Sequence, residues 1–347
     1  MLLYNFLIVN IERIRVIMLT MKDIAKEAGV SVMMVSRVIN KRYDLVSDKN
    51  IEKIEKIIKK YNFVPNSSAQ SLSSKSSKIR AVFMQGDASS LSNQYNSIML
   101  GNIIERVQSY GYNTMVHFVS EYSEIIDNLK AWKASGAIFF GSFVENINKL
   151  KENITIPLIF TDSYSPTKKV TNIGIDDYKG GALAANYFIK HGHKNLAYVG
   201  EYINDSLLVK ERFKGFSETL LSAGIPLIES HIINFTSIEN TVNELISIKD
   251  NHLGIFAFSD ILALKIINEL SNKGFSVPND FSIIGFDNLE ISSFSQPGLT
   301  TIKQDIVLKA ITSVDLLFKY IKSPDMSPQN IVLDVELIER NSVKKLL

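Results

Sequence analysis

Short apolar runs alternate with amphipathic stretches over most of the chain, from Ile79 onward. The runs are rich in β-branched and aromatic residues and read IRAVFM, TMVHFV, GAIFFG, PLIFTD, NLAYVG, HIINF, GIFAFSD and FSIIGFD. Runs of this kind separated by helical stretches predict βαβ units and a parallel sheet. About 260 residues is long for one sheet, so the pattern predicts two doubly wound parallel-sheet α/β lobes with a ligand cleft between them.

The N-terminal part carries apolar positions at helical spacing instead. The stretch TMKD, from Thr20 to Asp23, has the spacing of a capping box at a helix start. Gly29 predicts the end of this helix, because glycine adopts the left-handed conformation without steric cost. Ser31 can cap a second helix over 32–40. Two short helices joined by a tight glycine turn predict a helix-turn-helix.

A third helix is predicted to cover the first two. Ser47 is placed to begin it, and Pro65 lies just beyond its end. Its apolar stripe follows the i, i+3, i+4 pattern and consists of Ile51, Ile54, Ile58 and Tyr61. Residues 18–64 are therefore predicted to form an all-α helix-turn-helix head.

The first seventeen residues, MLLYNFLIVNIERIRVI, match neither a signal peptide nor a membrane span. No Lys or Arg precedes the apolar stretch, and no small-residue cleavage site follows it. A span needs about 20 apolar residues, and one Glu and two Arg interrupt this stretch. We expect residues 1–17 to lie upstream of a true start at Met18 or Met21, and we expect no membrane contact.

Charge is distributed unevenly along the chain. Residues 18–78 hold twelve Lys and Arg against six Asp and Glu, which gives +6 on a chain whose net charge is +2. Residues 1–17 add +1, so residues 79–347 carry −5. A basic head on an acidic body is typical of a nucleic-acid-binding protein with a separate second module. Solvated helix faces are the alternative interpretation of the charge alone.

Several kinds of chemistry are excluded by residue usage. The chain has no cysteine, so disulfides, thiolate catalysis and cysteine-ligated metals are impossible. The five histidines show no H-E-x-x-H or similar metal spacing, and no nucleophile–base set or phosphate loop occurs. We therefore expect no enzyme activity, no cofactor and no metal. The lack of cysteine also fits a cytoplasmic protein.

The second predicted helix is the candidate for reading DNA. A recognition helix reads bases with its N-terminal residues in the major groove. There, Val32 and Met33 would meet thymine methyl groups, and Arg37 would contact guanine O6 and N7. Ser31, Ser36 and Asn40 suit phosphates, which position a protein without reading sequence, and Thr20 completes the DNA-contacting candidates. The alternative puts both methionines in the core and makes Arg37 an ordinary surface charge.

The sequence MKDIAKEAGVSVMMVSRVIN, followed by YNFVPNSSAQSLSSKSS, resembles the head of the LacI/GalR transcription regulators. The resemblance runs to about Glu339, with head, hinge and core in the family's order. It implies that Val32 and Met33 occupy the two variable base-reading positions and that Arg37 is the base-contacting arginine. At Met34 the chain departs from the family, which usually has a phosphate-contacting Thr or Ser there.

Residues 65–78, PNSSAQSLSSKSSK, have two interpretations. Their serine content predicts a flexible linker, whereas the family's PN-x-x-A-x-x-L pattern implies a hinge helix. Both hold if the segment is helical only on DNA, because it is too short for a stable isolated helix. The resemblance makes Leu72 a wedge in the minor groove and implies backbone contacts by Asn66, Ala69 and Gln70.

The resemblance further implies a periplasmic-binding-protein-like core over residues 79–340, with three crossovers between its lobes. One lobe would comprise 79–174 and 303–330. The other would comprise 175–302 and 331–340, with NIVLDVELIER as its last strand.

Effector-contacting candidates lie at the carboxyl ends of the predicted strands, where ligands bind in open α/β sheets. They include Asp162, Asp260 and Asp287, although a helix cap is an equal alternative for Asp287. By resemblance, Asp162, Asp260 and Arg212 match effector contacts. Phe235 matches an aromatic residue that stacks on the effector, with core packing as its rival interpretation. A carboxylate and a guanidinium facing a cleft can bind neighbouring sugar hydroxyls.

These features predict a sequence-specific transcriptional regulator, and the resemblance favours a repressor. A homodimer would bind a pseudo-palindromic operator in double-stranded DNA, under the control of a small-molecule effector, a sugar by resemblance. The alternative is a sugar-binding transport protein with the same core fold. The basic head and the poor match of the first residues to a signal peptide argue against that alternative.

Overall fold

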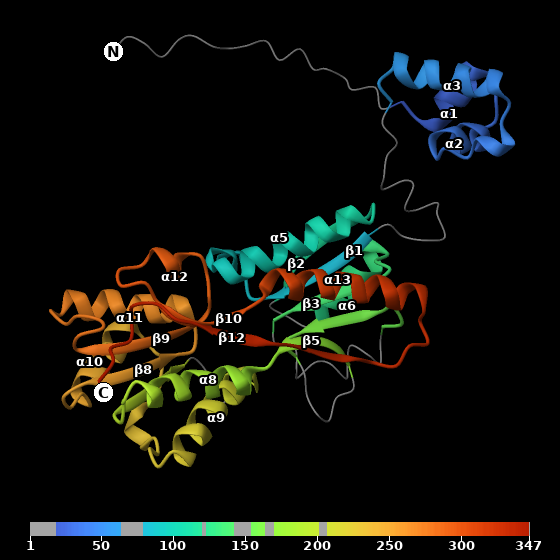
Figure 1. The fold of residues 1–347 in the computed structure, drawn as a ribbon. Coiled ribbons are helices and arrows are strands. Elements are labelled where there is room, and N and C mark those ends of the chain that lie inside the picture. Colours follow the sequence, from blue (N-terminus) through green and yellow to red (C-terminus); the bar gives the residue numbers. More distant parts are fainter. Residues whose placement is uncertain are drawn as a thin grey trace, which may run out of the picture. The chain divides into compact units, whose positions relative to one another are not determined.

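The computed structural model describes residues 19–63, 79–119, 123–141, 154–163, 170–200 and 207–346. The chain divides into two compact units, Met1–Ser76 and Ser77–Leu347. Figure 1 shows helices in the first unit, and sheets flanked by helices in the second. Within the described ranges, no helix combines the length and apolar character needed to cross a membrane.

Residues 19–63 of the first unit form three α-helices around one apolar core. The helices are α1 (Met21–Ala28), α2 (Val32–Ile39) and α3 (Asp48–Lys60), with a 3-10 turn over Tyr43–Leu45 before α3. The core is made of Ile24, Ala25, Ala28, Val35, Val38, Ile54 and Ile57. This arrangement confirms the predicted helix-turn-helix head.

The ends of the first two helices follow their predicted chemistry. The Asp23 N–H donates to the Thr20 hydroxyl at 3.3 Å, and the Thr20 N–H donates to the Asp23 carboxylate at 2.8 Å, which completes a capping box. Gly29 ends α1 with a φ of +64°. This left-handed conformation is energetically unfavourable for residues that carry a side chain. The Ser31 hydroxyl caps α2 by accepting from the Met34 N–H at 3.3 Å.

The described part of the second unit contains two six-stranded sheets. The first sheet has the order β11-β5-β4-β3-β1-β2, with all neighbours parallel. Its strands are β1 (Ile79–Gln85), β2 (Asn113–Val119), β3 (Ala137–Phe140), β4 (Leu158–Thr161), β5 (Thr171–Ile175) and β11 (Asn330–Leu333). The second sheet has the order β12-β10-β9-β8-β6-β7, and only the β10–β12 pair is antiparallel. Its strands are β6 (Leu196–Gly200), β7 (Ile232–Asn234), β8 (Leu253–Ala257), β9 (Phe281–Asp287), β10 (Thr300–Gln304) and β12 (Val335–Ile338).

Helices cover both faces of each sheet, as strands that are apolar on both faces require (Figure 1). In the first lobe, Val82 and Met84 of β1 pack under α5 and α13, whereas Ala81 and Phe83 pack under α6. In the second lobe, α8 and α9 cover one face, and α10 and α11 cover the other. The helices are α5 (Gln94–Ser109), α6 (Ser123–Trp132), α8 (Asp177–Lys190), α9 (Leu207–Ser222), α10 (Ile238–Ser247), α11 (Asp260–Asn272), α12 (Ile291–Phe294) and α13 (Ile306–Lys322). The predicted core of two doubly wound lobes is confirmed.

The last predicted strand is divided between the two sheets. β11 pairs with β5 in the first sheet, and after Asp334 the chain continues as β12, which pairs with β10 in the second sheet. The prediction that residues 331–340 belong to the second lobe is therefore wrong for Ile331–Leu333. Similarly, Lys303 and Gln304 lie in β10 of the second lobe, although residues 303–330 were predicted in the first. Both strands consist mainly of apolar residues, so the pattern does not mark the change of sheet.

Candidate DNA-binding helix and effector site

The N-terminal end of α2 presents apolar side chains to solvent. Met33 is 65 % exposed and Val32 is 39 % exposed, whereas Val35 and Val38 of the same helix are buried in the head core. Met34 is half-buried and packs against that core. The interpretation that both methionines are core residues is therefore wrong for Met33 and correct for Met34.

The polar candidates of the head differ in how free their side chains are. Among residues 19–63, no hydrogen bond or ion pair engages the Arg37 guanidinium. The Asn40 amide donates to the Ser36 carbonyl at 2.7 Å, so this side chain is partly committed to its own helix. The Thr20 hydroxyl is likewise occupied in the capping box. Arg37 is thus the free cation on α2.

Most of the head's other cations are exposed and form no ion pair within residues 19–63. In the described part of the head, only Lys60 forms an ion pair, with Glu27 at 2.9 Å. The exposed cations are Lys22, Lys26, Lys41, Arg42, Lys49, Lys53, Lys56, Lys59 and Lys60. All of these cations except Lys60 are available for phosphates. The predicted hinge residues Asn66, Ala69, Gln70 and Leu72 and the predicted extension 1–17 lie outside the described residues.

In the core, Arg212 is buried beside the start of α8. Its Nε donates to Asp177 Oδ1 at 2.6 Å, and its Nη1 donates to the Phe258 carbonyl at 2.7 Å. Burial raises the pKa of Asp177 to about 6, although the Arg212 charge opposes this shift. Arg212 is a predicted effector contact, but its partner Asp177 was not predicted.

Asp162 follows β4 and is held by a buried lysine. Lys309 of α13, whose side chain is 1 % exposed, donates to Asp162 Oδ1 at 2.7 Å and to Oδ2 at 2.9 Å. The Tyr95 hydroxyl of α5 donates to Oδ2 at 3.1 Å. Sequence reasoning missed both partners. The available signal was a lone lysine within the apolar stripe of α13, which contains Ile306, Ala310, Val314 and Leu317.

Asp287, at the end of β9, is also buried but forms no ion pair with any residue that the structure describes. The Gln304 side-chain amide donates to its Oδ1 at 2.6 Å. Burial raises the pKa of Asp287 to about 7, and the charge of Arg212 is the main opposing effect. Asp287 accepts from no backbone N–H of a helix start within the described residues, so the helix-cap alternative is wrong.

Asp260 is turned into the second lobe. It is fully buried at the start of α11 and accepts from the Leu289 N–H at 2.8 Å, the Ser292 hydroxyl at 2.6 Å and the Thr301 hydroxyl. Burial raises its pKa to about 6. Asp260 therefore ties α11 to α12 and β10, and its two carboxylate oxygens are already occupied.

Two of the predicted effector residues line separate cavities. Asp162 lines a cavity of about 280 Å³ where β5 and β11 meet the start of α8, together with Asn172, Asp177, Tyr178 and Glu211. Phe235 lines another of about 270 Å³ with Ile238 of α10 and Lys265, Asn268 and Glu269 of α11. Phe235 also packs against the core under α10 and α11. The structure thus brings Asp162 close to the Arg212–Asp177 pair and leaves Phe235 apart from them.

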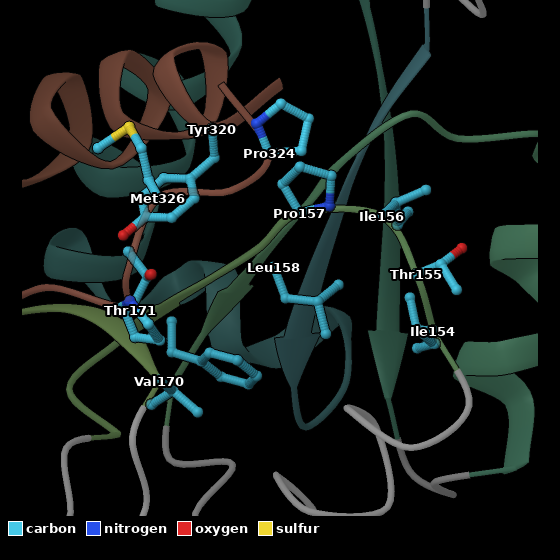
Figure 2. Close-up of a pocket in the computed structure, with 12 residues that line it drawn as sticks. Ile154, Thr155, Ile156, Pro157, Leu158, Val170, Thr171, Tyr320, Pro324 and Met326 are labelled. Carbon is cyan, nitrogen blue, oxygen red and sulfur yellow. The ribbon is translucent and has the colours of Figure 1, made fainter. Parts of the chain in front are cut away.

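A third cavity, of about 250 Å³, lies at the opposite end of the first sheet. Figure 2 shows its wall, with Pro157 and Leu158 at the start of β4, Val170 and Thr171 at the start of β5, and Tyr320 of α13. This cavity lies at the amino ends of the strands, whereas ligands of open α/β sheets lie at the carboxyl ends. It contains no predicted site residue.

Comparison with known proteins covers both units. Residues 20–66 match the family described as bacterial regulatory proteins, lacI family, and residues 185–343 match a periplasmic binding protein-like domain. The HTH-type transcriptional regulator MalR of Clostridium butyricum is 34% identical over 339 residues, which cover 93% of this chain and 99% of that protein.

Two solved structures are similar as well. A lac repressor dimer bound to operator and the anti-inducer ONPF has a TM-score of 0.83 and 26% identity, over 94% of this chain and 99% of that one. A LacI family transcriptional regulator from Enterococcus faecium with bound ribose has a TM-score of 0.67 and 27% identity, over 77% of this chain and 100% of that one.

These relatives are transcriptional regulators, in agreement with the prediction of a DNA-binding regulator rather than an enzyme. The similarity to MalR and to the lac repressor extends over the helix-turn-helix head and both lobes of the core. The chain therefore belongs to the LacI family of bacterial transcriptional regulators.

Proposed function

We propose that this regulator acts in the cytoplasm as a homodimeric repressor, with α2 of each copy in the major groove of a pseudo-palindromic operator. The observation that carries the proposal is the outer face of α2, where Val32 and Met33 are exposed and Arg37 has no partner among residues 19–63. Val32 and Met33 would contact thymine methyl groups, and Arg37 would contact guanine. The similar lac repressor is a dimer bound to operator.

The remaining head residues serve to position the protein in this proposal. Ser31, Ser36 and Asn40 would contact phosphates, and Thr20 would act mainly through its capping box. In the hinge, Leu72 would open a base step, with Asn66, Ala69 and Gln70 on the backbone.

We further propose that a sugar bound in the core controls operator affinity. Asp162 and Arg212 would contact the sugar, and the cavity beside Asp162 and Asp177 would receive it. Asp260 and Asp287 would support this site from the second lobe, whereas Phe235 lines a separate cavity. The Enterococcus faecium relative, which holds ribose, supports a sugar as the ligand class.

The test is selection of duplexes from the source genome by the purified full-length chain. An inverted repeat should be enriched. Operator affinity should fall steeply as the salt concentration rises, because binding of the protein's Lys and Arg side chains releases condensed counterions from DNA. The head-disrupting variant Val35→Asp is the control and should enrich nothing. Enrichment of no inverted repeat by the unaltered chain would contradict the proposal. The genes beside the selected sites would then indicate which sugars to test.

A further inference from the structure

Lys309 is the one lysine that is buried among the described residues. Its ammonium contacts three side chains: Asp162, Tyr95 at 3.0 Å and Gln304 Oε1 at 3.1 Å. A buried charge is costly unless it is paired and hydrogen-bonded, and here every ammonium proton has an acceptor. The site is therefore built around this cation.

These contacts come from both lobes. Tyr95 and Asp162 belong to the first lobe, on α5 and after β4, and α13 packs in that lobe. Gln304 ends β10 in the second sheet, and its amide donates to Asp287 of β9 at 2.6 Å. A continuous polar chain thus runs from Asp162 through Lys309 and Gln304 to Asp287.

These contacts join residues on either side of a crossover between the lobes. β10 ends at Gln304, and α13 begins two residues later, after Asp305 caps it by accepting from the Leu308 N–H at 2.8 Å. A rotation of one lobe against the other about this crossover would change the distance between the Lys309 ammonium and the Gln304 side chain.

We propose that Lys309 is a positioning residue that couples the effector site to the arrangement of the lobes. It holds the Asp162 carboxylate by both oxygens, and it transmits any displacement of that carboxylate to Gln304 and Asp287. A ligand hydroxyl that binds Asp162 competes with the ammonium for the same oxygens, so it frees the ammonium to shift relative to Gln304, the contact that joins the two lobes. This inference rests on the proposed effector site.

The rival interpretation is that Lys309 only stabilises the first lobe. Loss of a buried partner would then lower thermal stability without changing amide exchange in the second lobe or affinity for DNA. The two interpretations therefore differ in where a Lys309 substitution has its effect.

The experiment compares Lys309→Met, Asp162→Asn and the double variant with Lys303→Met. Lys303→Met removes the same charge on the neighbouring strand β10. The Lys303 side chain, however, is 43% exposed and pairs with Glu336 on the surface. Affinity for the selected duplex is measured by fluorescence anisotropy, and amide exchange by mass spectrometry, at a temperature where every variant is folded.

Both single variants should change the operator Kd by about tenfold or more in the same direction, a typical size for coupling between sites. The double variant should change it no further, because both substitutions remove one interaction. Lys303→Met should stay within about twofold, as expected for an exposed pair. Amide exchange should quicken in second-lobe peptides that contain Phe286–Leu289.

Operator affinity unchanged in Lys309→Met, or faster exchange confined to α5 and α13, would overturn the proposal. The exchange measurement needs no DNA. If selection yields no duplex, the proposed function fails, and the exchange pattern still decides the role of Lys309.

Discussion

The guanidinium of Arg212 lies over the ring of Phe286, with its central carbon 3.5 Å from the ring centroid. Stacking on an aromatic face suits a planar cation that has lost its water. The same guanidinium pairs with Asp177, so Phe286 and Asp177 together fix its orientation beside the proposed effector site.

Arg212→Met should strongly destabilise the core near pH 8. The substitution leaves the Asp177 carboxylate buried without a partner, and loss of one partner of a buried pair costs about 3–5 kcal/mol. Urea unfolding measures this loss. Arg106→Met is the matched control, because Arg106 also pairs with a carboxylate, Asp315, but both side chains are more than one-third exposed. Arg106→Met should lower the free energy of unfolding by at most about 1 kcal/mol. If both variants lost the same free energy of unfolding, burial of the Arg212–Asp177 pair would not explain the effect of Arg212→Met.

Asp287→Asn should stabilise the protein at pH 8 more than at pH 5. Burial raises the pKa of Asp287 to about 7, above the usual 3.8, so the folded state gains stability as the carboxyl takes up a proton between pH 8 and pH 5. Asn cannot titrate, so its advantage should shrink by about 2 kcal/mol over that interval.

Urea unfolding at both pH values checks this prediction against Asp280→Asn. The Ser276 N–H lowers the pKa of Asp280, so Asp280 stays ionised at both values and its contribution is lost only at lower pH. The effect of Asp280→Asn should therefore be the same at pH 8 and pH 5. An advantage of Asp287→Asn that does not shrink would disprove ionisation of a buried Asp287.

Arg37→Met should relax sequence preference at one base pair of each operator half-site. Loss of a bidentate contact to guanine costs about 1–3 kcal/mol of discrimination. Duplex selection with the variant reveals the change as degeneracy at that position. Lys26→Met, which removes an exposed lysine of α1, should instead weaken binding to all duplexes alike. Retained preference at every position in Arg37→Met would exclude base contact by Arg37.

Ser31→Ala should loosen the start of α2 by about 1 kcal/mol, the usual cost of losing an N-cap hydrogen bond. Ser47 occupies the equivalent position before α3 but makes no side-chain cap bond. Ser47→Ala should therefore cost only a few tenths of a kcal/mol. Hydrogen exchange of the Met34 and Val35 amides, against those at the start of α3, measures both effects, and similar losses would argue against the cap at Ser31.

The features predicted correctly from the sequence are local or periodic. The capping box from Thr20 to Asp23 and the turn at Gly29 depend on neighbouring residues alone, so their chemistry is visible in the chain. The apolar runs also identify the parallel strands, because such strands are buried on both faces. Tyr61 was misplaced by periodicity: it follows the end of α3 and is 41% exposed, while Ile57 fills the core.

The features that sequence reasoning missed depend on distant residues. Lys309 and Asp162 are 147 positions apart, and nothing near either residue indicates the other. Arg212 and Asp177 are 35 positions apart and meet only because α8 and α9 pack together. The sequence therefore identifies candidate charged residues, but it does not identify the residues that pair with them.

The C-terminal strand pair has a consequence for how the lobes move and fold. A single residue, Asp334, joins an edge strand of one sheet to an edge strand of the other. So short a link lets the lobes pivot there but leaves no slack for them to slide apart. A nonsense mutation upstream of residue 330 would remove an outer strand from both sheets at once, so neither lobe can be completed until nearly the whole chain has been synthesised.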